Sequence, residues 1–91
     1  MQIQKATTAT DILKCWEVIK VLRPHLEQDL FVATVNEMMT EGYRLVFIEE
    51  DGKAAAAVGF RYLQYLYNGK HFYIDDLSTL PESREIGRAH V

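Results

Sequence analysis

Two dipeptides, Asp51-Gly52 and Asn68-Gly69, constrain the fold of this chain more than any other feature. Both are pairs preferred in two-residue type I′ hairpin turns, because both central residues of such a turn need a positive φ. The segments around them, residues 43–50, 53–67 and 70–80, are rich in β-branched and aromatic residues, which are enriched in strands. The sequence therefore predicts three antiparallel strands in chain order.

The turn lengths also predict a strand register, provided that no bulge intervenes. Across the second turn Arg61 is expected opposite Asp76, which makes a cross-strand ion pair and leaves Asp75 less committed. Across the first turn Phe47 is expected opposite Ala56. A large residue opposite a small one is sensible packing and explains why alanines stand in a strand.

The first part of the chain carries helix signals after a short first strand at residues 1–6. Thr8 stands three residues before Asp11, a loose capping box, and apolar residues then recur at helical spacing. Pro24 ends this pattern, so we expect one helix over residues 9–22.

A second helix is expected over residues 27–41, with Gly42 as its C-terminal cap. The predicted fold class is α/β (α+β-like), with the order β-α-α-β-β-β: an antiparallel meander with two helices. The predicted sheet carries apolar side chains on both faces, and two helices cover only one face. One series is Phe47, Val58, Phe60, Tyr62 and Leu77; the other is Val46, Ile48, Leu63, Tyr65, Phe72 and Ile74.

Composition excludes several classes of protein. The 91 residues are enough for one small domain, and the net charge of −3 argues against a nucleic-acid binder or an anionic-membrane binder. No apolar run is long enough to span a bilayer, and no signal peptide is visible. The single cysteine, Cys15, excludes an internal disulfide and fits a reducing cytoplasm. Three scattered histidines provide no metal cluster, so no metal is expected.

The last seven residues, 85–91, read as a tail of foreign origin. Their final six residues, Ile-Gly-Arg-Ala-His-Val, are one reading frame of a sequencing adapter that ends in a stop codon. We therefore expect a native partial domain over residues 1–84 and a non-native tail over residues 85–91. The codons across this tail in the nucleotide record decide the matter.

The stretch from Tyr73 to Arg84, after a strand, two helices and a meander, resembles the GNAT acyltransferase superfamily. In that family the fourth strand commonly reads Tyr or Val, Ile or Val, Asp-Asp-Leu-x-Thr, as Tyr73 to Thr79 does here. The resemblance covers nearly all of residues 1–84 and stops where the family continues with its pyrophosphate loop. It implies the N-terminal part of an N-acetyltransferase, truncated at that loop, whose parent transfers an acetyl group from acetyl-CoA to an amine.

The resemblance also implies roles for particular residues. Asp75 is the expected catalytic base and Asp76 the second choice. Leu77, Ser78 and Thr79 are expected to contact the acetyl-CoA cosubstrate mainly through their backbones, and Arg84 is expected to begin its phosphate loop. The acceptor is expected to be a small-molecule or peptide amine. The fragment itself is expected to be inactive, because half of its cofactor site is missing.

Other interpretations of the same residues remain open. The two aspartates can be read as solvated carboxylates at a strand end instead of catalytic groups. The aromatic residues of the sheet can be read as the lining of an acceptor pocket, or as cross-strand pairs and core. A different class of function is a small binding or dimerisation module that self-associates through its exposed sheet face. A small ligand-binding α+β barrel needs more strands than the sequence predicts.

Overall fold

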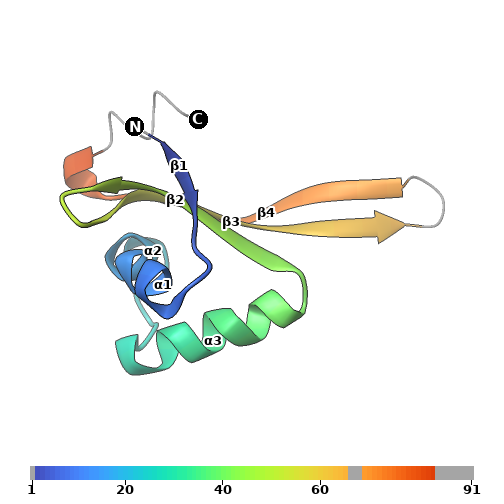
Figure 1. Cartoon of the computed structure of the whole chain (residues 1–91), viewed down its shortest axis with the longest axis horizontal. Coiled ribbons are helices and arrows are strands. Elements are labelled where there is room, and N and C mark those ends of the chain that lie inside the picture. Colours follow the sequence, from blue (N-terminus) through green and yellow to red (C-terminus); the bar gives the residue numbers. More distant parts are fainter. Residues whose placement is uncertain (1, 66–68, 84–91) are drawn as a thin grey trace.

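The computed structural model describes residues 2–65 and 69–83. In these residues the α-helices pack on one side of a four-stranded sheet (Figure 1). The predicted α+β class and the order of the four strands are confirmed, but three α-helices stand where two were predicted. The sheet is antiparallel throughout, with the spatial order β1-β2-β3-β4. The elements are β1 (Ile3–Lys5), α1 (Ala9–Lys14), α2 (Trp16–Leu22), α3 (Gln28–Thr40), β2 (Tyr43–Glu50), β3 (Lys53–Tyr65), β4 (Gly69–Thr79) and the 3₁₀ turn η1 (Pro81–Ser83).

The first helical segment begins as predicted but consists of two helices. The N–H of Asp11 donates to Oγ1 of Thr8 at 3.1 Å, which confirms the helix cap. The expected single helix over residues 9–22 is wrong, because the segment divides at Cys15 into α1 and α2. There the N–H of Cys15 bonds the carbonyl of Ile12, three residues back, and this tight turn interrupts the α-helical ladder.

The third helix ends where the sequence places its cap. Gly42 has a φ of 98°, and its N–H bonds the carbonyl of Met39 at 3.3 Å. This left-handed conformation is accessible to glycine at little cost, so the chain can leave α3 and enter β2 directly.

The first hairpin turn is confirmed, but its register shifts. Asp51 and Gly52 have φ values of 55° and 83°, as a type I′ turn requires. An irregularity between Ile48 and Glu49 then moves the pairing by one residue, so that Phe47 lies opposite Ala57 instead of Ala56. A shift of one residue moves the side chains of β3 to the other face relative to β2, so Val58 lies opposite Val46 and Ala57 lies opposite Phe47.

The second hairpin differs more. Tyr65 pairs with Gly69, and Asn68 lies outside the described residues. The expected register is wrong by three residues at Arg61, which lies opposite Tyr73 and not opposite Asp76. The bounds of β3 and β4 differ accordingly from the predicted ranges 53–67 and 70–80.

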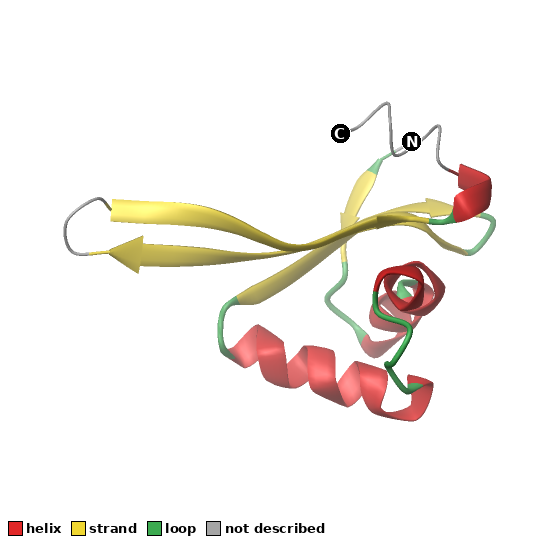
Figure 2. Ribbon diagram, turned by 180° about the vertical axis from the view of Figure 1, so that it is seen from behind, coloured by secondary structure: helices red, strands yellow, loops and turns green. Residues whose placement is uncertain are grey.

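The core lies between the sheet and the helices, all on one face (Figure 2). It combines residues of the helical segments with alternate residues of β2 and with two alanines of β3: Ile12, Cys15, Trp16, Val18, Ile19, Phe31, Val35, Tyr43, Leu45, Phe47, Ala54 and Ala57. The two predicted apolar series are therefore wrong in membership, because Val58 pairs with Val46 and so lies on the opposite face from Phe47. On β4, Ile74 and Leu77 remain 52% and 40% exposed.

None of the helices in residues 2–65 and 69–83 has the length and apolar character needed to cross a membrane.

Candidate functional site

The predicted acidic pair lies at an irregularity in the pairing of β3 and β4. Gly59 pairs with Asp76 and Phe60 pairs with Ile74, so Asp75 is an extra residue on β4. An extra residue of this kind breaks the alternation of side chains along a strand. As a result, both neighbouring carboxylates reach the surroundings of Tyr43, Asp76 through its hydroxyl and Asp75 through Arg61.

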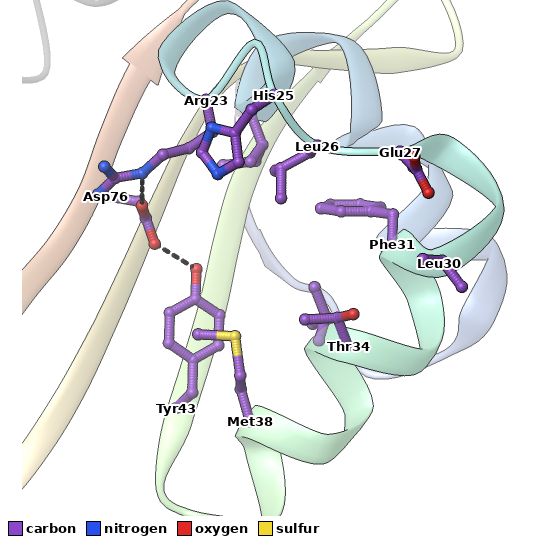
Figure 3. A pocket seen from close by; sticks show the side chains of 12 residues that line it. Arg23, His25, Leu26, Glu27, Leu30, Phe31, Thr34, Met38, Tyr43 and Asp76 are labelled. Carbon is purple, nitrogen blue, oxygen red and sulfur yellow. Dashed lines mark hydrogen bonds and ion pairs between the residues drawn. The ribbon is translucent and has the colours of Figure 1, made fainter.

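Asp76 is the buried member of the pair, with 9% of its surface exposed. Its Oδ2 accepts a hydrogen bond of 2.8 Å from the Tyr43 hydroxyl, and its Oδ1 accepts one of 3.2 Å from Nε of Arg23 (Figure 3). A carboxylate out of bulk water needs such partners, because an unpaired buried charge is costly. The two contacts join Asp76 on β4 to β2 and to the end of α2.

Gly59 makes the approach of Tyr43 to Asp76 possible. Tyr43 lies on β2, Asp76 lies on β4, and Gly59 stands between them on β3. A Cβ atom at Gly59 would overlap the Tyr43 hydroxyl group. The absence of a side chain therefore lets the tyrosine cross the intervening strand, a recognised use of glycine within a sheet.

Asp75 is less buried and pairs with the second arginine of the site. Nε of Arg61 donates to Oδ2 of Asp75 at 2.8 Å. The same guanidinium lies 5.5 Å from the ring centroid of Tyr43, within cation–π range. Arg23 donates from Nη2 to the backbone carbonyl of Asp75 at 3.3 Å. Two arginines and two aspartates thus surround Tyr43, with no net charge among them.

The expected pairing of the carboxylates is therefore wrong in detail. Arg61 binds Asp75, not Asp76, because the register shift moves Arg61 along the strand. The catalytic roles of Asp75 and Asp76 stay predictions, since nothing in the geometry tests a proton transfer.

Tyr43 acts as a neutral donor in this cluster. Burial raises the pKa of its hydroxyl, and the hydrogen bond to Asp76 and the charge of that carboxylate raise it further. The phenol therefore keeps its proton across the physiological range and can donate it to Oδ2 of Asp76. Cys15 is equally unsuited to ionise, because burial raises the pKa of its thiol to about 12.

Arg23, Tyr43 and Asp76 line one side of a pocket of about 480 Å³. The rest of its wall comes from α2, the following loop and α3 (Figure 3). Six of these residues are apolar, namely Ile19, Leu26, Leu30, Phe31, Val35 and Met38, and three are polar, namely His25, Glu27 and Thr34. Pockets for small molecules typically have such a lining, with a few polar groups that fix the ligand's orientation.

The predicted cosubstrate-contacting residues lie along the end of β4. Ser78 is buried on the helix side, Leu77 is exposed and Thr79 is half-buried. Within the described residues, β4 pairs with β3 alone, so alternate backbone groups of β4 are available on its other edge. Arg84 lies outside the described residues. The roles of these four residues stay predictions.

Within residues 2–65 and 69–83, no group of three or more His, Cys, Asp or Glu side chains is arranged to hold a metal ion.

The sequence did not predict a role in the site for Gly59 or for Arg23. Gly59 had a detectable signal, because an isolated glycine in a strand often marks the close approach of another group. Arg23 had none: its position before Pro24 predicts a helix end, and only the packing of α2 against β4 brings it to Asp76.

Comparison with known proteins agrees with the fold. No protein-family model matches the chain, and no curated protein matches it. Among solved structures, the chain is similar to a crystal structure of a Trypanosoma brucei acetyltransferase, with a TM-score of 0.71 and 16% sequence identity. The match covers 97% of this chain and 67% of that chain. The chain thus has the α+β fold of part of that acetyltransferase structure.

Proposed function

We propose that this chain is part of a GNAT-type N-acetyltransferase, which transfers the acetyl group of acetyl-CoA to an amine. The observation that carries the proposal is the position of Asp75 and Asp76. They lie on the edge strand β4 of an acetyltransferase-like fold, and Asp76 lines a pocket of small-molecule size. Fold alone does not determine function, so the proposal rests on this combination.

In the proposed reaction the neutral amine nitrogen attacks the carbonyl carbon of the thioester. The carbon–sulfur bond then breaks, the nitrogen loses its second proton to the departing thiolate, and the products are the amide and free CoA. The amine must first lose a proton, and Asp75 is the proposed acceptor of that proton. The Asp75 side chain is part-exposed and held by Arg61. The free edge of β4 at Leu77, Ser78 and Thr79 would align the acetyl donor through backbone hydrogen bonds.

We further propose that these 91 residues alone do not turn over substrate. About a third of the T. brucei acetyltransferase chain lies outside the match, which covers 67% of it. An acetyl donor aligned along β4 needs a second wall, which the described elements do not provide.

The test is expression of the uninterrupted reading frame that contains these codons, beside the 91-residue chain. Acetylated amine is measured by mass spectrometry after incubation with acetyl-CoA and a panel of primary amines. We expect product from the longer protein and none from the 91-residue chain. A reading frame without a glycine-rich loop after Arg84, or a longer protein without acetyl transfer, would overturn the proposal.

A second candidate function is self-association through the sheet. Ile74 and Leu77 expose apolar surface on β4, beside a strand edge that is unpaired within the described residues. Such surfaces favour association with another chain. A stable, defined dimer without any acetyl transfer by the longer protein would favour this module over the enzyme.

A further inference from the structure

The pocket beside Asp76 holds a pair of opposite charges in an otherwise mostly apolar wall. Arg23 and Asp76 both line it, and their contact stands at one side of the cavity (Figure 3). Phe31, Val35 and Met38 of α3 contribute apolar surface to the same cavity. A ligand that fills this space meets the adjacent charges of Arg23 and Asp76 together with an apolar surface, and the Glu27 carboxylate and His25 also line the cavity.

Of the two charged side chains, only that of Arg23 is weakly held. Arg23 binds Asp76 at 3.2 Å and the Asp75 carbonyl at 3.3 Å, both longer than the 2.8 Å between Arg61 and Asp75. The Arg23 side chain is 47% exposed, whereas that of Asp76 is 12% exposed. Arg23 can therefore turn towards a ligand at low cost.

Asp76, in contrast, is held in place. The Tyr43 hydroxyl keeps its 2.8 Å hydrogen bond to Oδ2 whatever Arg23 does. A carboxylate has about four lone-pair positions, so Asp76 has capacity for a further donor from the pocket.

We propose that this pocket binds a free α-amino acid with an apolar side chain. Its ammonium group binds Asp76, its carboxylate binds Arg23, and its side chain lies against Phe31, Val35 and Met38. The assignment rests on the proposed function, in which the amino group of this ligand accepts the acetyl group. It deepens that function by naming the substrate class.

Charge matching selects the zwitterion over simpler ligands. A lone amine satisfies Asp76 but leaves the displaced Arg23 with the Asp75 carbonyl and no anionic partner from the ligand. A lone carboxylate satisfies Arg23 but is repelled by Asp76. The two charges of an α-amino acid are carried on one carbon atom, so they can meet two adjacent side chains without leaving either charge unpaired. The volume of about 480 Å³ accommodates such a molecule.

The test is calorimetric binding to the full chain in the absence of acetyl-CoA. The probes are L-leucine, leucinamide, isoamylamine, isocaproate and L-asparagine. Leucinamide and isoamylamine lack the carboxylate, isocaproate lacks the amine, and L-asparagine has a polar side chain of similar size. We expect L-leucine to bind about tenfold or more tighter than every other probe. No binding of L-leucine, or leucinamide and isoamylamine binding as tightly as L-leucine, would overturn the proposal.

Variants connect the binding to the pocket. Arg23→Gln should remove the preference for L-leucine over leucinamide, and Asp76→Asn should weaken L-leucine about tenfold or more. Asp29→Asn is the matched control, because it removes the same charge from α3 at a position that does not line the pocket. Circular dichroism verifies that each variant is folded.

If Asp76→Asn does not fold, a variant that fills the pocket with a large side chain still tests the proposal. Thr34 is an exposed residue at the pocket, and Thr34→Trp should block L-leucine without changing any charge. Ala33→Trp, at the next position on the exposed surface of α3 and outside the lining, should bind L-leucine as the parent does. Equal binding by both variants would overturn the proposal.

The two proposals fail separately. L-Leucine binding without acetylation by the longer protein would overturn the acetyltransferase and leave the amino-acid pocket standing. Acetylation of simple amines with no preference for L-leucine would overturn the amino-acid pocket and leave the acetyltransferase standing.

Discussion

The hydroxyl group of Tyr43 donates a hydrogen bond of 2.8 Å to Oδ2 of Asp76, across a strand that lies between the two residues. The bond ties β2 to β4 directly and holds a buried carboxylate on the edge strand. It exists because Gly59 on β3 leaves space above the sheet. The position of the candidate site therefore depends on a residue that has no chemical function of its own.

Gly59→Ala should destabilise the fold by about 1–3 kcal/mol, because the new Cβ overlaps the Tyr43 side chain and forces it away from Asp76. Urea unfolding measures the change. The loss should be smaller in a Tyr43→Phe background, where the closest atom is gone. An unchanged stability in the Tyr43 protein would show that the tyrosine does not occupy this space.

Tyr43→Phe should cost about 1 kcal/mol at neutral pH through the lost hydrogen bond, and it should also change the alkaline behaviour. The pKa of Tyr43 is raised in the folded state above its ordinary value near 10. Its contribution is therefore complete below pH 10 and is lost as the pH rises above that value. Urea midpoints measured from about pH 9 to about pH 11 should fall more steeply for the parent than for Tyr43→Phe. Parallel slopes would contradict the assignment.

Asp75→Asn in the longer protein should reduce kcat about 100-fold near neutral pH, with the KM for acetyl-CoA little changed. The substitution keeps the shape of the side chain and removes the basic carboxylate. Asp76→Asn is the comparison, made on the same strand. If Asp76→Asn removes turnover and Asp75→Asn is silent, the two roles are reversed.

Gly52→Val should destabilise the first hairpin by about 1–3 kcal/mol, because a β-branched residue resists the φ of 83° found there. Gly52→Asn is the control, since asparagine tolerates the left-handed region far better. Thermal unfolding followed by circular dichroism separates the two. Equal melting temperatures would mean that the turn adopts another conformation.

Ile74→Lys should reduce self-association of the chain, because Ile74 exposes apolar surface on the sheet face away from the helices. Sedimentation velocity at several concentrations measures the association. Val21→Lys makes the same change at an exposed position on α2 and should leave the association as it is. Identical sedimentation of all three proteins would place the contact elsewhere.

Local signals in the sequence were sufficient to predict the helix caps and the first turn. Thr8 with Asp11, Gly42 and Asp51-Gly52 each act within a few residues, and each is found where the sequence predicted a cap or a turn. The break at Cys15 was not predicted, because the apolar spacing continues across it and only one hydrogen bond changes its length.

The site was less predictable, although Asp75 and Asp76 are adjacent in the sequence. Their partners depend on the register of β3 against β4, and one irregularity at Gly59 changes which arginine each carboxylate meets. Arg23 lies more than fifty residues from Asp76 along the chain. No short-range pattern carries that information.

By itself, the sequence determined the order of the strands, the first turn and the capped helix ends, because these depend on the φ preferences and hydrogen bonds of neighbouring residues. The tertiary structure alone decided which sheet face is buried and which charges meet at Asp76. A register shift of one residue reverses the face of a strand at small local cost, so the packing of the whole core, and not any single dipeptide, selects the register.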